Sequence, residues 1–312
     1  MIKINPMPEA VTFHKKHVDG VFHNLITKGY ILRGKKQRNI SKSFINFLIK
    51  YKDELITALP NRLLEINEEF EKKNFSKHQL ILIKSFFLDT GYINFPNKDF
   101  LNHLKIDTCV YCNKNYTLYY NGNNARAELD HWFPKEKFPI LALSFYNLIP
   151  SCHSCNHIKG NGDVLIKQLL AKTKVTQKEI NDWWRNALSN LNHPYIDNSD
   201  FKFSYSYRTI NDFNMELKVD KNSKAHTTLK FNKTEEIYNA NSEKELKDII
   251  DLRYKYSDNY IDILIHQSFK GIMSKEEIYR VIFGIETHEE DYHKRPFSKF
   301  KHDIIEELKQ IK

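Results

Sequence analysis

The feature that most restricts how this chain can fold is the placement of its cysteines. All four fall into two C-x-x-C pairs, with 39 residues between the pairs. A two-residue gap lets both thiolates of a pair reach one tetrahedral ion, and two pairs complete a closed four-thiolate site of the structural type. We therefore predict one structural zinc ion, bound by Cys109, Cys112, Cys152 and Cys155.

Two other interpretations of the cysteines stay open. They could be four unrelated buried thiols, although no cysteine of the chain falls outside the pattern. His153 or His157 could replace a thiolate as a ligand, but the spacing does not require it. Disulfides are disfavoured because residues 1–10 carry no secretion signal, and we expect a cytoplasmic protein, whose thiols stay reduced. No apolar run is long enough to span a bilayer.

The hydrophobic pattern on either side of the cysteines is mainly helical, for example over residues 44–59. Residues 201–219 alternate apolar and polar side chains around a short linker, which is typical of an antiparallel hairpin. We predict an α+β chain that is mainly helical. Its expected parts are a helical region at 1–104, a zinc-stabilised unit at 105–165, and a helical region with the hairpin at 166–312.

The charge balance favours a polyanionic partner. The chain has 48 lysines and arginines against 39 aspartates and glutamates, a formal net charge of +9. Basic side chains that face phosphates gain affinity by releasing counterions. A lysine-rich solvated surface would give the same balance, so the charge supports a nucleic-acid partner without requiring one.

Between and just after the cysteine pairs, the sequence resembles the HNH endonuclease superfamily. The resemblance covers about residues 105–165 and joins its elements in one order: the first pair, Asp130-His131, Asn147, the second pair, and Asn156 followed by Lys159-Gly160. The third signature position is His in some members and Asn in others, so Asn156 fits it. The resemblance implies a zinc-stabilised ββα-metal unit, a β-hairpin followed by a helix around one divalent catalytic ion.

The chemistry of phosphodiester hydrolysis suggests a role for each matching residue. The reaction needs an activated water and neutralisation of charge at the phosphorus. A neutral histidine has a pKa suited to accepting the proton of that water, so His131 is the expected general base. The amide of Asn147 is expected to accept from the second ring nitrogen and fix its tautomer. Oxygen atoms of Asp130 and Asn156 suit a hard ion, Mg²⁺ or Mn²⁺.

Three details of this assignment depend on local geometry. Adjacent residues of a regular strand point to opposite faces, so Asp130 and His131 reach one site only at a strand end or bulge. Lys159 lies one turn beyond Asn156, where it either contacts phosphate or is a solvated helix lysine. Glu128 shares the strand face of Asp130, where it could be a further metal ligand or support one from outside, and it stays outside the core assignment.

Further phrases resemble a bacterial group of HNH proteins; they are Phe133-Pro134-Lys135 and residues 141–150 and 295–299. Members are often paired with an SMC-like or ABC-type ATPase in antiphage defence, as in Septu-type and some retron systems. The resemblance implies a nuclease effector with an ATPase partner, acting on DNA or, as a second choice, on RNA such as tRNA. The alternative function is a zinc-dependent nucleic-acid-binding or interaction module without catalysis.

Overall fold

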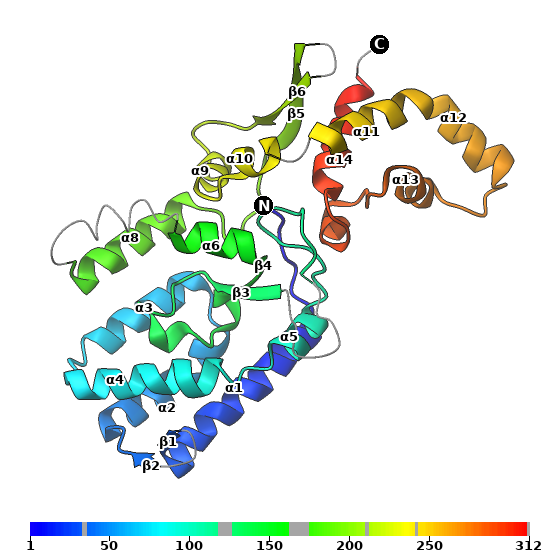
Figure 1. The fold of residues 1–312 in the computed structure, drawn as a ribbon. Helices are drawn as coiled ribbons and strands as arrows, with labels where there is room; N and C mark the ends of the chain where they lie inside the picture. The colour runs from blue at the N-terminus through cyan, green and yellow to red at the C-terminus, as the bar shows by residue number, and fades with distance from the viewer. Residues whose placement is uncertain (33–35, 118–126, 162–174, 210–211, 241–242, 311–312) are drawn as a thin grey trace.

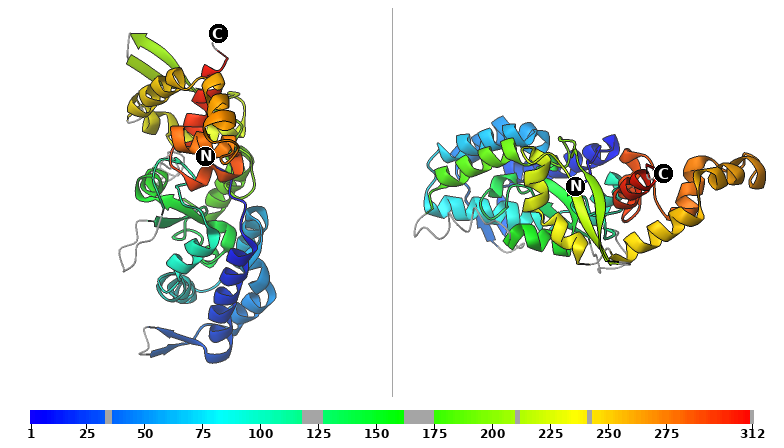
Figure 2. Two further views of the ribbon diagram at one scale, coloured as in Figure 1. Left: turned by 90° about the vertical axis from the view of Figure 1, so that its right-hand side faces the viewer. Right: turned by 90° about the horizontal axis from the view of Figure 1, so that it is seen from above.

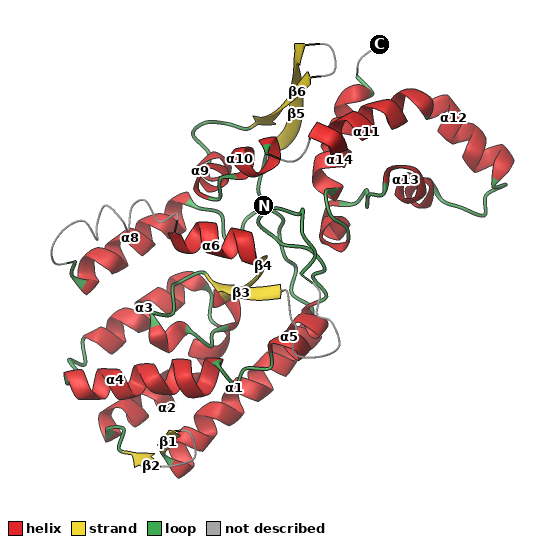
Figure 3. Cartoon of the chain, viewed as in Figure 1, coloured by secondary structure: helices red, strands yellow, loops and turns green. Residues whose placement is uncertain are grey.

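The computed structural model describes residues 1–32, 36–117, 127–161, 175–209, 212–240 and 243–310. Within these ranges the chain is mainly helical and has three two-stranded antiparallel hairpins, as Figure 3 shows. The predicted mainly helical α+β class is confirmed. No helix in the described ranges combines the length and apolar character needed to cross a membrane.

The N-terminal part is a layer of packed helices (Figure 1). Prolines at the first position begin two of them, and the Ser41 and Ser76 hydroxyls cap two others by accepting from the backbone three residues on. The helices are α1 (Pro8–Lys28), α2 (Lys42–Thr57), α3 (Pro60–Glu71), α4 (Lys77–Ser85), the π-helical turn η1 (Phe86–Tyr92) and α5 (Asn97–Leu104). A short hairpin that the sequence analysis did not predict joins β1 (Tyr30–Leu32) to β2 (Lys36–Arg38) between α1 and α2.

The central unit has the predicted order of two strands and a helix. Strand β3 (Ala127–His131) pairs antiparallel with β4 (Leu148–Cys152), and α6 (His153–Asn161) follows β4 directly. The connection between the strands contains two single 3-10 turns, η2 (Pro139–Leu141) and η3 (Phe145–Asn147). Every residue of β4 is buried, so this strand crosses the interior.

The C-terminal part starts with α8 (Gln177–Asn190), which a capping box between Thr176 and Glu179 begins. Strands β5 (Lys202–Thr209) and β6 (Asp212–Lys218) form the predicted antiparallel hairpin, which is confirmed. The remaining elements are α9 (Lys224–Phe231), α10 (Thr234–Asn239), α11 (Glu243–Lys255), α12 (Asp258–Ile263), η4 (Leu264–Ser268), α13 (Lys275–Phe283), η5 (Glu289–Lys294) and α14 (Ser298–Leu308).

The buried hydrophobic residues of the described chain form two clusters. One draws on residues 1–195 and the other on residues 201–308. The molecule is correspondingly elongated, with helices α11–α14 at the opposite end from the N-terminal helices (Figure 2). Helix α8, which the sequence division assigns to the C-terminal region, packs into the first cluster because the Trp184 ring contacts those of Trp132 and Phe133.

Asn113 joins the two clusters. It is buried, has the left-handed φ of 49°, and ends the turn that carries the first cysteine pair. Its side-chain nitrogen lies 2.9 Å from the Tyr292 carbonyl oxygen and 3.1 Å from that of Arg295. Its own carbonyl accepts from Phe297 N at 2.6 Å, and its side-chain oxygen accepts from Lys299 N at 3.3 Å. The turn of the first cysteine pair therefore anchors the C-terminal part.

Three buried histidines should make the stability of the fold depend on pH. Burial is the main cause that lowers the pKa of each imidazole to about 3; they are His14, His131 and His193. In an unfolded chain the ring protonates near pH 6.5, so below that pH the unfolded state binds more protons than the folded state. The free energy of unfolding should then fall by about 2 kcal/mol for each histidine between about pH 6.5 and pH 5.

Urea denaturation at a series of pH values measures this loss. The His14 ring lies among those of Phe95, Phe100 and Phe145, so His14→Phe keeps an aromatic ring there and removes one titrating group. We expect a shallower loss of stability with falling pH in this variant. Identical slopes for the variant and the natural protein would contradict the prediction for His14.

Candidate active site and metal centre

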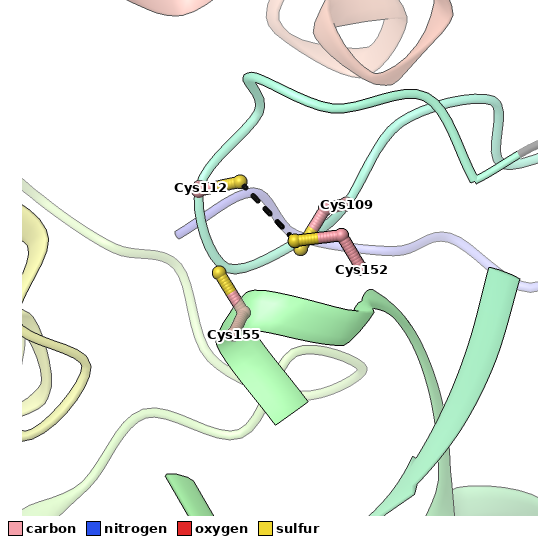
Figure 4. Close-up of side chains that lie close together, drawn as sticks. All are labelled: Cys109, Cys112, Cys152 and Cys155. Carbon is pink, nitrogen blue, oxygen red and sulfur yellow. Dashed lines mark hydrogen bonds between the residues drawn. The ribbon is translucent and has the colours of Figure 1, made fainter. Parts of the chain in front are cut away.

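The four cysteine sulfurs converge between the turn of the first pair and the junction of β4 with α6 (Figure 4). Their sulfur atoms all lie within 4.8 Å of one another, all four residues are buried, and Cys112 Sγ lies 4.0 Å from Cys152 Sγ. Four soft donors around one point fit a tetrahedral ion such as zinc. The predicted metal-binding arrangement of the cysteines is confirmed. Among the described residues no second cluster of three or more Cys, His, Asp and Glu side chains is arranged in this way.

The cysteine cluster has polar support from its surroundings. Lys114 N donates to Cys112 Sγ at 3.4 Å, and the Asn115 amide donates to Cys152 Sγ at 3.3 Å. Such bonds spread the charge of a metal-bound thiolate and orient it. The Tyr238 hydroxyl of α10 donates to the Cys112 carbonyl at 2.7 Å, so the C-terminal part also holds this turn. His153 is outside the cluster and donates instead to the Glu128 carboxylate at 2.7 Å.

Asp130 and His131 are the last two residues of β3, and both line one open cleft of about 440 Å³. Because they lie at the end of the strand, these two adjacent residues can reach one site, as the sequence analysis expected. The cleft brings together four of the five predicted residues of this site: Asp130, His131, Asn156 and Lys159. The fifth, Asn147, is fully buried and is not part of the lining.

A backbone carbonyl fixes the tautomer of the His131 ring. Its Nε2 lies 3.1 Å from the Ala142 carbonyl oxygen, and a carbonyl only accepts, so Nε2 carries the hydrogen. Nδ1 is then the acceptor of the neutral ring. Burial, followed by the nearby Lys135 charge, lowers the pKa of His131 to about 3, so the ring stays neutral at neutral pH. The Tyr92 ring packs against it at 4.5 Å between ring centres.

Asn147 does not orient the ring directly, in contrast to the expectation. Its Oδ1 accepts from Phe133 N at 2.6 Å, and its Nδ2 donates to the Leu141 carbonyl at 2.8 Å. The Asn147 amide therefore holds the connection between β3 and β4 together. The Ala142 carbonyl, not Asn147, fixes the tautomer of the His131 ring. Asn147 acts one step further away, by fixing the loop that presents this carbonyl.

Lys159 is neither a solvated lysine nor a free phosphate contact, the two roles considered from the sequence. Its side chain is 7% exposed, and its Nζ lies 2.5 Å from Asp130 Oδ2 and 3.2 Å from the His131 carbonyl oxygen. The Tyr111 hydroxyl donates to the same Asp130 oxygen at 2.6 Å. Lys159 and Tyr111 together fix the Asp130 carboxylate.

Glu128 is a residue that the sequence reasoning left out of the site. Its Oε2 accepts from Asn156 Nδ2 at 2.6 Å, while its Oε1 accepts from His153. Because the Asn156 nitrogen is held in this way, its Oδ1 is the atom left for another ligand. The only sequence signal for this role was the position of Glu128 two residues before Asp130, on the same strand face.

The cleft offers two oxygen donors for a hard cation. Within the described part of the chain, neither Asp130 Oδ1 nor Asn156 Oδ1 makes a hydrogen bond, and both residues line the cleft. Two protein oxygens suit Mg²⁺ or Mn²⁺, because such ions keep several waters and take further ligands from substrate phosphate. The donor set therefore fits the catalytic ion that the resemblance implied.

Strands β3 and β4 and helix α6, with Asp130 and His131 at the end of the first strand, all lie within one segment that matches a known family. Residues 109–162 match the sequence profile of the HNH endonuclease family. These residues form an HNH endonuclease domain. The resemblance found in the sequence is confirmed for this segment of the chain.

The chain also resembles a known protein over a short stretch. Over 55 residues the chain is 36% identical to the Septu protein PtuB of Bacillus thuringiensis. This match covers 18% of the present chain and 20% of PtuB, so the chain aligns with about a fifth of its relative. No solved structure matches the chain.

Proposed function

We propose that this protein is a metal-dependent nuclease that hydrolyses phosphodiester bonds of nucleic acid, with DNA the favoured substrate over RNA. The observation that carries the proposal is that His131, Asp130 and Asn156 line the same cleft. A histidine base beside oxygen donors for a hard cation is one combination that supports phosphodiester hydrolysis.

Each residue of the cleft has a separate role in the proposed reaction. His131 Nδ1 accepts the proton of the attacking water, because the Ala142 carbonyl keeps the hydrogen on Nε2. Asp130, fixed by Lys159 and Tyr111, and Asn156, oriented by Glu128, would hold the cation. When bound, this Mg²⁺ or Mn²⁺ ion supplies charge neutralisation at the phosphate.

The likeness to PtuB supports a role as the effector of a bacterial antiphage defence system, working with an SMC-like or ABC-type ATPase. The four cysteines would hold one structural zinc, separate from the catalytic ion, because the sulfur cluster is closed and the cleft offers oxygens.

The proposal is tested by incubating the purified protein with plasmid DNA and with total RNA, in the presence of Mg²⁺ or Mn²⁺. Each reaction is run with the protein alone and again with its genomic neighbour, if one encodes an ATPase. Cleavage of either substrate supports the proposal and identifies the nucleic acid. Binding of nucleic acid without cleavage under every condition would favour the alternative, a zinc-dependent binding module.

The two metals should separate in a chelation experiment. Mild EDTA treatment should abolish cleavage, and added Mg²⁺ or Mn²⁺ should restore it, while metal analysis shows that zinc stays bound. The reason is that a buried four-thiolate site releases its ion far more slowly than two oxygens in an open cleft. Full activity of a preparation that contains zinc alone would contradict a separate role for the second ion.

A further inference from the structure

Two lysines line the HNH cleft within the described chain, and only one of them has a carboxylate partner. Lys159 is paired with Asp130. Lys135 makes no hydrogen bond or ion pair in the described part of the chain, and its Nζ lies 4.2 Å from the centre of the Tyr92 ring. The adjacent Glu136 is already paired with Lys84 at 2.6 Å. The cleft therefore contains a half-buried positive charge without a neutralising partner.

The position of Lys135 is defined by its neighbours. The Tyr92 ring contacts both the Lys135 ammonium and the His131 ring, so it places the charge beside the general base. The Tyr92 hydroxyl donates to the Leu129 carbonyl at 3.2 Å, which ties this ring to β3. The Pro134 carbonyl accepts two backbone hydrogen bonds at 2.9 Å, so the turn that carries Lys135 is fixed as well.

A half-buried ammonium is unfavourable unless something replaces its lost hydration. Burial lowers the pKa of Lys135, which shows that its surroundings disfavour the charge. The face of an aromatic ring compensates only in part. A phosphate group of a bound nucleic acid would supply the missing negative charge.

We propose that Lys135 binds a backbone phosphate of the nucleic-acid substrate beside His131. This inference rests on the proposed function and assigns to Lys135 the contact that the sequence suggested for Lys159. The two lysines then have separate roles: Lys159 fixes the Asp130 carboxylate, and Lys135 meets the substrate.

The test compares Lys135→Met with Lys137→Met. Each variant removes one positive charge, but Lys137, two residues further on, is not part of the cleft lining. Binding of a short fluorescent DNA duplex is measured in Ca²⁺ over a series of salt concentrations, with an RNA duplex in parallel. We expect Lys135→Met to make the slope of log affinity against log salt shallower by about 0.9 and to weaken binding on the order of tenfold at low salt.

Lys137→Met should leave the slope close to that of the natural protein. Lys135→Arg, which keeps the charge and the ring contact, should restore the slope. Equal slopes for both methionine variants would overturn the inference, as would failure of Lys135→Arg to restore binding while thermal unfolding shows a folded protein. Absence of cleavage by the natural protein would count against the proposed function alone, because the binding slopes decide the role of Lys135 independently.

Discussion

Replacement of His131 by alanine is expected to slow cleavage by about 10²–10⁴-fold, the usual contribution of a positioned acid–base group. Zinc content should stay nearly unchanged, because His131 lies outside the cysteine cluster, and affinity for nucleic acid should change far less than the rate of cleavage. Initial rates of plasmid cleavage at saturating Mg²⁺ measure the effect. Asn147→Ala should give a smaller loss, since its amide supports the loop that presents the Ala142 carbonyl.

His193→Ala is the matched control for this experiment. His193 is also buried, and its Nε2 likewise contacts a backbone carbonyl, that of Tyr146 at 3.0 Å, but it does not line the cleft. Both variants leave a cavity of similar size, so a loss caused by instability would appear in both. Equal rates for the natural protein and His131→Ala would remove the proposed general base, and the binding-module alternative would then take its place.

Replacement of Cys109 by serine is expected to prevent stable folding of the HNH domain. Binding of a structural zinc contributes on the order of 10–16 kcal/mol, which is as large as the whole stability of a typical domain. Cys109 is fully buried, so no solvent molecule can take the place of its thiolate as the fourth ligand of the zinc ion. Metal analysis should find about one zinc per chain in the natural protein and much less in the variant.

Ser154→Ala serves as the control, because Ser154 lies exposed between the two cysteines of the second pair. It should keep both the zinc and the thermal unfolding temperature. A well-folded natural protein with no zinc and four reactive thiols would contradict the assignment of the metal site.

The parts of the site that follow from short spacings could be predicted from sequence. The cysteine pairs follow from spacing alone, whereas the order of strand, strand and helix and the placement of Asp130 and His131 at a strand end came from the resemblance to the HNH superfamily. The position of Asn156 just after the second pair brings it to the same cleft.

The contacts of Asn147 and Lys159 could not be predicted in this way. The Asn147 contacts depend on how the connection between β3 and β4 folds, and those of Lys159 on how α6 packs against β3. The hydrophobic pattern carries no information about which polar group an amide or ammonium meets. The sequence also could not predict that Lys135 lacks an ion-pair partner, because this depends on Lys84 of a distant helix pairing with Glu136. The membership of α8 in the first cluster follows from tertiary packing of its two tryptophans.

The bonds of Asn113 limit how far the HNH domain can be treated as a transferable module. A chain cut between the two hydrophobic clusters would keep every residue of the first cluster. It would nevertheless remove four hydrogen-bond partners of one buried asparagine: its amide nitrogen would keep Thr108 Oγ1, but its carbonyl and side-chain oxygens would lose Phe297 N and Lys299 N. Each unpaired buried group costs on the order of 1–3 kcal/mol. The nuclease could be grafted onto another scaffold only with a redesigned first cysteine turn, in which water or a new neighbour satisfies that amide.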